Sequence, residues 1–346
     1  LSTIHCKVTH LGSTSRPAKT VKLHPDGTQI MTTNTFEELC LSRARPVVTA
    51  EFNSFDGGDL STVEKALSEL SPYVDGVNIT DNPAAHAHAS NTAMAIAVKT
   101  LGGNPIMQIV CRDKNRLAIQ ADLVGASMFG IENFCALTGD DVTAGDEKEA
   151  RRVFDLDGPQ LIVVMNGISR GEYLSGRKLK HQPHMFIGAV ENPTAPPLDY
   201  RVDRAKKKVE AGAKFIQLQI CYQPKMLENF MKGCVANGVA ERAAIMPTVV
   251  FTKSARPLGF MDKSVPGISV PQEVIDRVAN SEDQAEESYL LVKEQVVHAL
   301  SLDGVAGIHL TDFRHDGSLQ RLTQELGIGP KSSNNQQQED ANAYSS

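Results

Sequence analysis

From Pro46 onward the chain alternates short apolar runs with longer segments whose apolar residues recur every three to four positions. Short runs rich in Val, Ile and Phe are typical of buried strands, and the longer pattern is typical of amphipathic helices that cover them. We therefore expect parallel strands joined by helical crossovers. The predicted strands are 47–52, 76–80, 105–111, 133–138, 184–190, 215–221, 244–252 and 304–311.

The amphipathic segments between these strands predict the helices, and several of them end in Gly, as helix carboxyl termini prefer. Eight strand-then-helix units favour an α/β fold of the (β/α)8 TIM barrel type, because an open doubly wound sheet more often stops at about five or six strands. The predicted helices include 61–74, 86–101, 114–129, 199–212, 224–237 and 286–301.

The pattern predicts a single barrel domain over residues 46–330 with a segment outside it at each end. Residues 1–45 contain turn residues and only weak periodicity, so we expect an amino-terminal extension that wraps the domain. Residues 331–346, KSSNNQQQEDANAYSS, have the polar composition of a disordered tail.

Polar residues stand at the carboxyl ends of the predicted strands, where the active sites of (β/α)8 barrels lie. Side chains two positions apart on a strand share a face, as Thr138 and Asp140 do. An inward-facing polar side chain is costly to bury unless a partner or a ligand satisfies it. The candidates are Glu51, Thr80, Gln108 with Arg112, Thr138 with Asp140, Glu191 with Asn192, Gln219 with Tyr222, and Asp312 near Arg314.

The acidic candidates also have structural explanations. Glu51 ends an otherwise apolar strand, where desolvation would raise its pKa and suit a general acid. From its position alone, a solvated loop residue is the simpler interpretation. Asp140 and Asp141 follow a strand, and an Asx turn or a helix cap is the simpler interpretation of both. Gly139 fits such a turn and would also let the backbone approach a flat ligand closely.

Composition and charge narrow the class of protein. The 346 residues carry 35 Lys and Arg against 41 Asp and Glu, a net charge of −6 with the signs interspersed, so we expect no nucleic-acid partner. No apolar run approaches the roughly 20 residues of a membrane span, and no secretory signal is recognisable, so we expect a cytoplasmic protein. The six cysteines form no CxxC pair and are expected to be reduced.

Other motifs favour structural roles. His86 and His88 form an HxH pair without a third ligand at suitable spacing, so we expect no metal site. The glycines form neither a GxGxxG nor a Walker motif. The basic helix over 201–213 could present its lysines to solvent, or one of these lysines could meet a cofactor phosphate.

Six longer stretches follow one another over most of residues 46–312; they read VVTAEF, GVNITDNPAA, MQIVCRDKNRLAIQADLVGASMFGIENFCALTGDD, VFDLDGPQLI, FIGAVENPTAPPLDYRVDRAKKKVEAGAKFIQLQ and VPGISVPQEVIDRV. Together they resemble the methylenetetrahydrofolate reductase family, and are most similar to its bacterial branch that includes acetogen enzymes. The block from Met107 to Asp141 is the longest of them. The resemblance implies a flavin-dependent (β/α)8 barrel with FAD as its cofactor.

The resemblance also implies roles for individual residues. Glu51 matches the family's general acid, which protonates N10 of 5,10-methylenetetrahydrofolate so that the bridging ring opens, after which hydride from reduced flavin gives 5-methyltetrahydrofolate. Asp140 matches an aspartate beside the flavin that influences its electronics, and Gln219 matches a glutamine that hydrogen-bonds the pterin. The positions of the flavin cleft are matched by Thr80, Gln108, Thr138, Gly139, Asp140, Phe154, Asp155, Glu191, Asn192 and Lys207.

The sequence leaves three matters open. The electron donor could be NADH, NADPH or a reduced partner protein, because acetogen-like members differ in their donor. The chain is compatible with a homo-oligomer. Two alternative functions are a pterin- or corrinoid-linked methyltransferase barrel without flavin and a non-catalytic barrel that binds folate or a partner protein.

Overall fold

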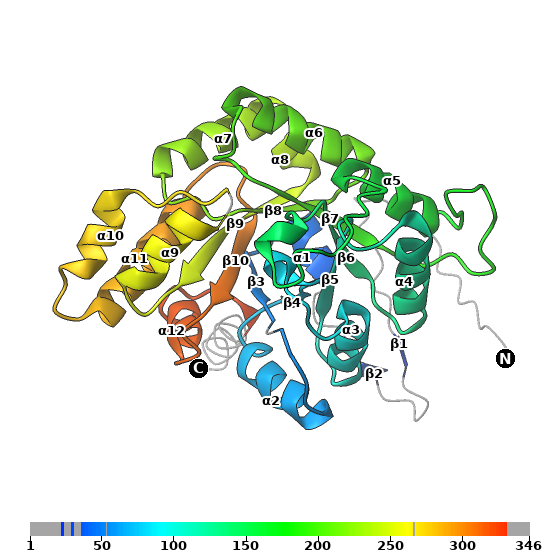
Figure 1. Ribbon diagram of the computed structural model, residues 1–346, viewed down its shortest axis with the longest axis horizontal. Helices are drawn as coiled ribbons and strands as arrows, with labels where there is room; N and C mark the ends of the chain where they lie inside the picture. The colour runs from blue at the N-terminus through cyan, green and yellow to red at the C-terminus, as the bar shows by residue number, and fades with distance from the viewer. Residues whose placement is uncertain (1–21, 24–28, 31–35, 53, 266, 331–346) are drawn as a thin grey trace, which may run out of the picture. The chain divides into compact units, whose positions relative to one another are not determined.

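The computed structural model describes residues 22–23, 29–30, 36–52, 54–265 and 267–330 of the chain (Figure 1). The chain divides into two compact units, Leu1–Thr35 and a second that begins at Phe36. In the first unit, strands β1 (Lys22–Leu23) and β2 (Gln29–Ile30) pair antiparallel. The predicted disordered tail, 331–346, lies outside the described residues.

The second unit is built on a closed barrel of eight parallel strands in the order β10, β3, β4, β5, β6, β7, β8, β9. The barrel closes where β10 pairs with β3, with Val47 opposite Gly307 and Ala50 opposite Leu310. The predicted (β/α)8 fold is therefore confirmed, and each predicted strand boundary lies within three residues of the observed one. The strands are β3 Val47–Glu51, β4 Gly76–Ile79, β5 Pro105–Val110, β6 Asn133–Leu137, β7 Phe186–Glu191, β8 Phe215–Leu218, β9 Ala244–Phe251 and β10 Gly307–Asp312.

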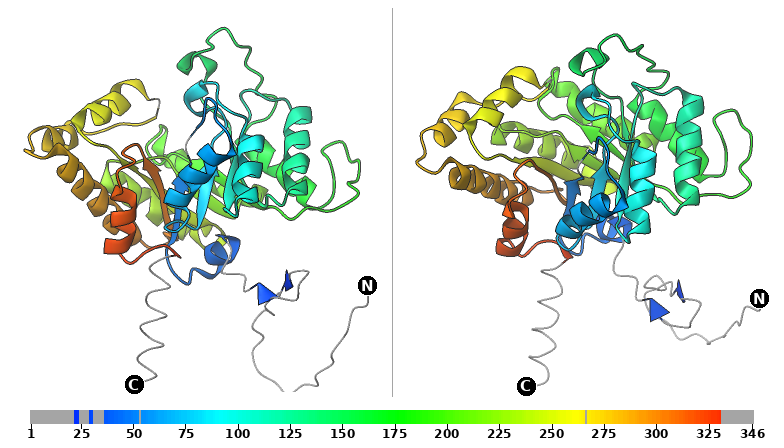
Figure 2. Two further views of the ribbon diagram at one scale, coloured as in Figure 1. Left: turned by 90° about the horizontal axis from the view of Figure 1, so that it is seen from below. Right: turned by 60° about the horizontal axis from the view of Figure 1, so that its bottom comes forward.

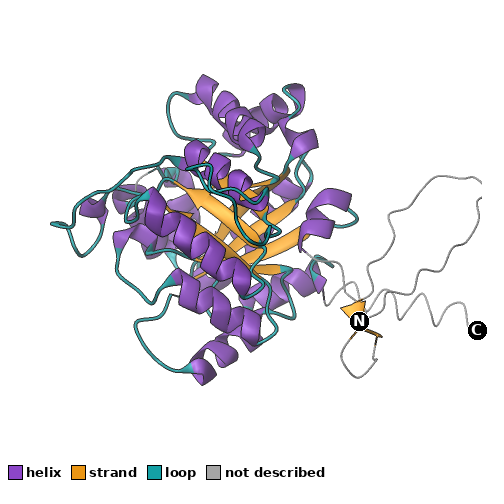
Figure 3. Ribbon diagram, turned by 90° about the vertical axis from the view of Figure 1, so that its right-hand side faces the viewer, coloured by secondary structure: helices purple, strands orange, loops and turns teal. Residues whose placement is uncertain are grey.

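Helices surround the barrel, as Figure 3 shows in purple around the orange strands. Helices α2 and α5 are each preceded by an aspartate whose side chain accepts a hydrogen bond from a free backbone N–H group of the first turn. Asp59 forms a capping box with Thr62, and Asp157 forms one with Gln160. None of the helices in the described ranges is long and apolar enough to cross a membrane. The helices are α1 Phe36–Ser42, α2 Leu60–Leu70, α3 Asn91–Thr100, α4 Arg116–Met128, α5 Gly158–Ser169, α6 Arg201–Ala211, α7 Pro224–Ala236, α8 Val239–Arg242, α9 Ala255–Ser264, α10 Gln272–Ala279, α11 Gln284–Leu300 and α12 Ser318–Glu325.

The predicted helix over 86–101 is wrong at its amino-terminal end, because α3 begins only at Asn91. A short 3-10 turn over Pro83–Ala85 precedes it, and Ala84 and Ala85 have φ angles of 51° and 62°. His86 and Ser90, at the two ends of the missing stretch, have ψ angles of 140° and 129°, which lie outside the helical region. The residues between β4 and α3 therefore form a loop at the carboxyl end of the barrel.

Helix α1 closes the opposite end of the barrel, as the side views of Figure 2 show in dark blue. Phe36 meets the rings of Phe186 and Phe215, the first residues of β7 and β8, edge to face at centroid distances of 5.7 and 5.1 Å. Phe36, Leu39 and Cys40 are all buried, which is the i, i+3, i+4 spacing of one helix face. The sequence had placed this helix in an extension ending at residue 45, whereas the compact unit begins at Phe36.

Candidate active site

The carboxyl ends of the eight parallel strands meet at one rim of the barrel, and the structure brings most of the candidates together there. Glu51 and Glu191 are the last residues of β3 and β7, and Gln108 lies in the second half of β5. Thr80 and Thr138 directly follow β4 and β6, and Gln219 follows β8.

Glu51 is partly enclosed at the end of β3. The hydroxyl of Thr311 on β10 donates a hydrogen bond to its Oε2 over 3.3 Å. Burial raises the pKa of the Glu51 carboxyl, and the Thr311 hydrogen bond opposes that rise. A carboxyl that keeps its proton closer to neutral pH is suited to act as a general acid.

A layer of polar side chains closes the barrel one tier below Glu51. The amides of Asn78 and Gln217 bond each other in both directions, over 2.6 and 3.1 Å. Nε2 of Gln217 also donates to Oγ1 of Thr49 over 3.2 Å, and that hydroxyl lies 2.9 Å from Nδ1 of His309. Neither Gln217 nor His309 was a predicted site residue. The spacing of two between Gln217 and the candidate Gln219 was the available signal, since it puts both on one face of the strand.

The turn after β6 requires its glycine. Gly139 has a φ of +93°, and a Cβ at this position would lie 2.4 Å from Cγ1 of Val110. The hydroxyl of Thr138 accepts a hydrogen bond from the backbone N–H of Gly158, which starts α5, over 3.1 Å. Asp140 is exposed beyond this turn.

Asp141 caps the next turn. It accepts a hydrogen bond from the backbone N–H of Thr143 over 2.9 Å and pairs with Arg152 over 2.5 Å. The hydrogen bond from Arg152 holds the pKa of the Asp141 carboxyl well below its usual range. The two neighbouring acids thus differ in role: Asp141 is a structural cap, whereas the carboxylate of Asp140 does not take part in that cap.

Helix α6 directs three cations at Glu191. Oε2 of this carboxylate lies 2.6 Å from Nζ of Lys208 and 3.7 Å from Nε of Arg204, and Oε1 lies 3.3 Å from Nη1 of Arg201. Residues 201, 204 and 208 share one helix face by their spacing. Lys208 is buried, and desolvation lowers its pKa.

Lys207, another residue predicted for the flavin cleft, lies on a different flank of α6 from Lys208. Its ammonium is exposed and donates to the Tyr200 hydroxyl over 2.6 Å, on the flank of α6 that faces solvent. A shift of one residue rotates a helical side chain by about 100°, so Lys208 faces Glu191 whereas Lys207 faces Tyr200.

The remaining predicted residues line the loops around the rim. Asp155 pairs with Arg116 over 2.7 Å, and this hydrogen bond lowers its pKa to about 2. Phe154 adopts a φ of 39°, with its N–H bonded to the carbonyl of Cys111 over 3.1 Å. The amide of Asn192 donates to the carbonyl of Gly267 over 2.8 Å.

Gln219 is exposed, and its Oε1 accepts a hydrogen bond from the backbone N–H of Ile220 over 3.0 Å. His88 of the HxH pair bonds Asp56 over 2.6 Å, whereas Nδ1 of His86 lies 3.1 Å from the carbonyl of Ala84. Within the described ranges no group of three His, Cys, Asp or Glu side chains is arranged to hold a metal ion.

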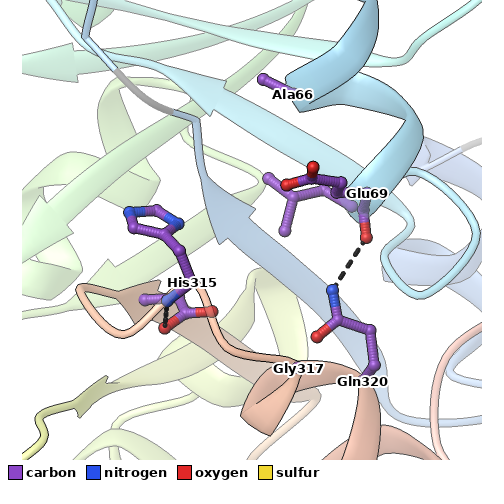
Figure 4. Close-up of a pocket in the computed structure, with 7 residues that line it drawn as sticks. Ala66, Glu69, His315, Gly317 and Gln320 are labelled. Carbon is purple, nitrogen blue, oxygen red and sulfur yellow. Dashed lines mark hydrogen bonds between the residues drawn. The ribbon is translucent and has the colours of Figure 1, made fainter.

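A separate cavity of about 270 Å³ lies outside the barrel, between α2 and the segment that links β10 to α12 (Figure 4). The amide of Gln320 donates to the carbonyl of Glu69 over 3.0 Å at its edge. Its lining includes the strand-end candidate Asp312, but none of the residues that the resemblance matches to the general acid, the flavin cleft or the pterin contact. Its lining consists of Ala66, Glu69, Leu70, Asp312, His315, Gly317 and Gln320.

Comparison with known structures supports the fold. A protein from Clostridium thermocellum, described as binding two copies of 5-methyl-5,6,7,8-tetrahydrofolic acid, superposes with a TM-score of 0.57 at 14% sequence identity. The match covers 83% of this chain and 96% of that one. At this identity the likeness establishes a shared barrel fold.

Sequence comparison places the chain in a family. It is 23% identical over 282 residues to a probable methylenetetrahydrofolate reductase (NADPH) of Caenorhabditis elegans, and 28% identical over 185 residues to methylenetetrahydrofolate reductase 2 of Schizosaccharomyces pombe. These matches cover 78% and 52% of this chain but only 40% and 28% of the relatives, so the chain spans less than half of their length. The family profile of methylenetetrahydrofolate reductase matches residues 58–327. This chain therefore belongs to the methylenetetrahydrofolate reductase family.

Proposed function

We propose that the protein reduces 5,10-methylenetetrahydrofolate to 5-methyltetrahydrofolate with FAD as its cofactor, in one-carbon metabolism. The observation that carries the proposal is Glu51: a carboxyl of raised pKa at the carboxyl end of β3 in a barrel of this family. Opening the bridged ring of the folate requires a proton at N10, and a partly enclosed acid of raised pKa can supply it. Bound FAD would supply the hydride.

The residues around Glu191 fit the diphosphate of FAD. Arg201, Arg204 and Lys208 surround a single carboxylate, which leaves this part of the rim with more positive than negative groups. Nε of Arg204 is buried without a hydrogen-bond partner among the described residues. A buried donor without a partner is costly, and a phosphate oxygen is a suitable acceptor for it.

The other proposed FAD contacts come from neighbouring strand ends. The turn at Gly139 has no side chain, so it would let a flat ring approach the backbone closely. Asp140 would lie beside the flavin and tune its electronics, and the exposed Lys207 would contribute to the flavin cleft, as the resemblance implies. Lys208 would add positive charge near the diphosphate. The further residues proposed for FAD are Thr80, Gln108, Thr138, Phe154, Asp155, Glu191 and Asn192.

Gln219 would hydrogen-bond the pterin, because its amide is exposed at the rim, at the end of β8. The binding of methyltetrahydrofolate by the Clostridium thermocellum barrel supports a folate ligand for this rim. The electron donor is proposed to be NAD(P)H or a reduced partner protein.

Purification and anaerobic spectroscopy test the proposal. The protein should hold FAD or bind it when added, and its reduced form should be reoxidised by methylenetetrahydrofolate. Glu51→Gln should slow that reoxidation by about 100- to 10,000-fold while the flavin stays bound and reducible. Glu69→Gln, which changes an exposed glutamate of the outer cavity, is the matched control and should behave as the wild type.

The alternative functions predict different results. A protein that stays colourless and neither binds FAD nor gains activity from it would be a methyltransferase or a non-catalytic barrel. Unchanged folate turnover in Glu51→Gln would remove this residue from the mechanism.

A further inference from the structure

Two inward-facing pairs of residues lie one above the other where the barrel closes between β3 and β10. The register places Thr49 opposite His309 and Ala50 opposite Leu310, so Glu51 comes opposite Thr311. Alternate residues of a strand share a face, and both pairs therefore face the interior of the barrel. The lower pair belongs to the closed polar layer, and the upper pair contains the proposed acid.

Thr311 holds one oxygen of the acid and leaves the other free. Its hydroxyl, which is buried, donates to Oε2 of Glu51 over 3.3 Å. In the part of the chain that the structure describes, Oε1 of Glu51 has no hydrogen-bond partner. When the carboxyl is protonated, the oxygen that accepts from Thr311 is suited to be its carbonyl oxygen, and the proton then resides on Oε1.

We propose that Thr311 is a positioning residue for Glu51, which it orients so that Oε1 carries the proton to the substrate. This inference rests on the proposed function, since it assigns Thr311 a part in the folate half-reaction. Among the described side chains, the Thr311 hydroxyl hydrogen-bonds Glu51 alone, and it transfers no proton.

The layer below fixes the position of the pair. Gln217 reaches across the barrel to Thr49, and Thr49 bonds His309, which ties β3 to β10 one step below Glu51 and Thr311. Burial lowers the pKa of His309 to about 4, so the imidazole is neutral in the working range. Burial and the Thr311 hydroxyl are thus the influences on the Glu51 carboxyl, with no charged group below it.

Thr311→Val and Thr311→Ser separate the hydroxyl from the shape of the side chain. Valine has nearly the shape of threonine without the hydroxyl, and serine keeps the hydroxyl. The pKa of the Glu51 carboxyl is measured from its infrared band, assigned as the signal that Glu51→Gln abolishes. Stopped-flow reoxidation of the reduced protein by methylenetetrahydrofolate is followed across pH in parallel, with reduction by dithionite as the control for flavin binding.

We expect Thr311→Val to raise the pKa of Glu51 by roughly half a unit to one unit, because a hydrogen bond that favours the carboxylate is lost. The pH above which folate reduction declines should rise by the same amount. The plateau rate should fall about 10- to 100-fold because the acid loses its orientation. Thr311→Ser should restore both properties, and dithionite reduction should be unchanged in both variants.

Two results would overturn the inference. An unshifted carboxyl pKa in Thr311→Val would mean that the hydroxyl does not act on Glu51. A shifted pKa with an unaltered rate and pH profile would mean that the contact plays no part in the reaction. Failure of the proposed function is distinguishable, because a wild-type protein that never oxidises its flavin with folate would still yield the infrared pKa of Glu51.

Discussion

The buried imidazole of His309 should make the protein sensitive to mild acid. His309 lies in the polar layer of the barrel with its Nδ1 2.9 Å from the hydroxyl of Thr49. Nε2 of Gln217, which can only donate, lies 3.3 Å from Nδ1, so Nδ1 is the acceptor and the neutral ring carries its proton on Nε2. Protonating Nδ1 would leave two donors facing each other in an interior that is closed to water.

The size of the effect follows from the pKa of His309, which burial lowers from 6.5 to about 4. A base of lowered pKa binds its proton less well in the folded than in the unfolded chain, so its contribution to stability is present above pH 6.5 and is lost as the pH falls toward 4. The contribution of this residue to the free energy of unfolding should fall by about 2 kcal/mol between pH 7 and pH 5, and by about 3 kcal/mol between pH 7 and pH 4.

Urea denaturation of the wild type and of His309→Asn at pH 7, 6 and 5 measures the effect. Asparagine retains an acceptor near the position of Nδ1 but does not titrate in this range. The difference in unfolding free energy between the two proteins should shrink by about 2 kcal/mol from pH 7 to pH 5. Glu51, whose raised pKa acts in the opposite direction, is present in both proteins and cancels. A difference that stays constant with pH would refute a neutral, buried His309.

Three further predictions concern the rim. Asp140→Asn should raise the flavin reduction potential and slow folate reduction, because a carboxylate beside the flavin disfavours its anionic reduced form; an unshifted potential in a redox titration would leave Asp140 as a turn residue. Lys208→Met should lower the free energy of unfolding, measured by urea denaturation, by about 3 kcal/mol or more, since it removes the nearest cation from buried Glu191. Replacing the exposed neighbour in Lys207→Met should change the free energy of unfolding by no more than about 0.5 kcal/mol. Equal losses in the two variants would contradict the pairing of Lys208 with Glu191. Gly139→Ala should lower the free energy of unfolding, measured by thermal denaturation, by about 2 to 4 kcal/mol, because alanine would combine a φ of +93° with a clash against Val110. A decrease of less than about 0.5 kcal/mol would contradict this strain.

The periodicity of the chain determined the barrel. Strands buried on both faces have continuous apolar runs, and the helices that cover them have one apolar face, so the two kinds of segment are recognisable without any tertiary contact. The strand ends then identified Glu51 and Gln219 as rim residues. The pattern failed over residues 86–90, which were predicted to be helical. The backbone N–H groups of His88 and Ala89 bond Asn82 and Phe55, and such loop contacts leave no periodic signal.

Only the tertiary structure decided which polar residues are partners. The local sequence could not show which of Asp140 and Asp141 has a structural role. The ion pair with Arg152, eleven residues further along the chain, shows that Asp141 has it. The sequence also could not show that Lys208 of α6, rather than its neighbour Lys207, pairs with the buried carboxylate of Glu191 on β7. The contact between Glu51 and Thr311 joins residues 260 positions apart, at the place where the barrel closes. The sequence by itself determined the elements and the end of the barrel that carries the site, because these follow from local periodicity, whereas ion pairs and pKa values depend on neighbours that only closure of the barrel brings together.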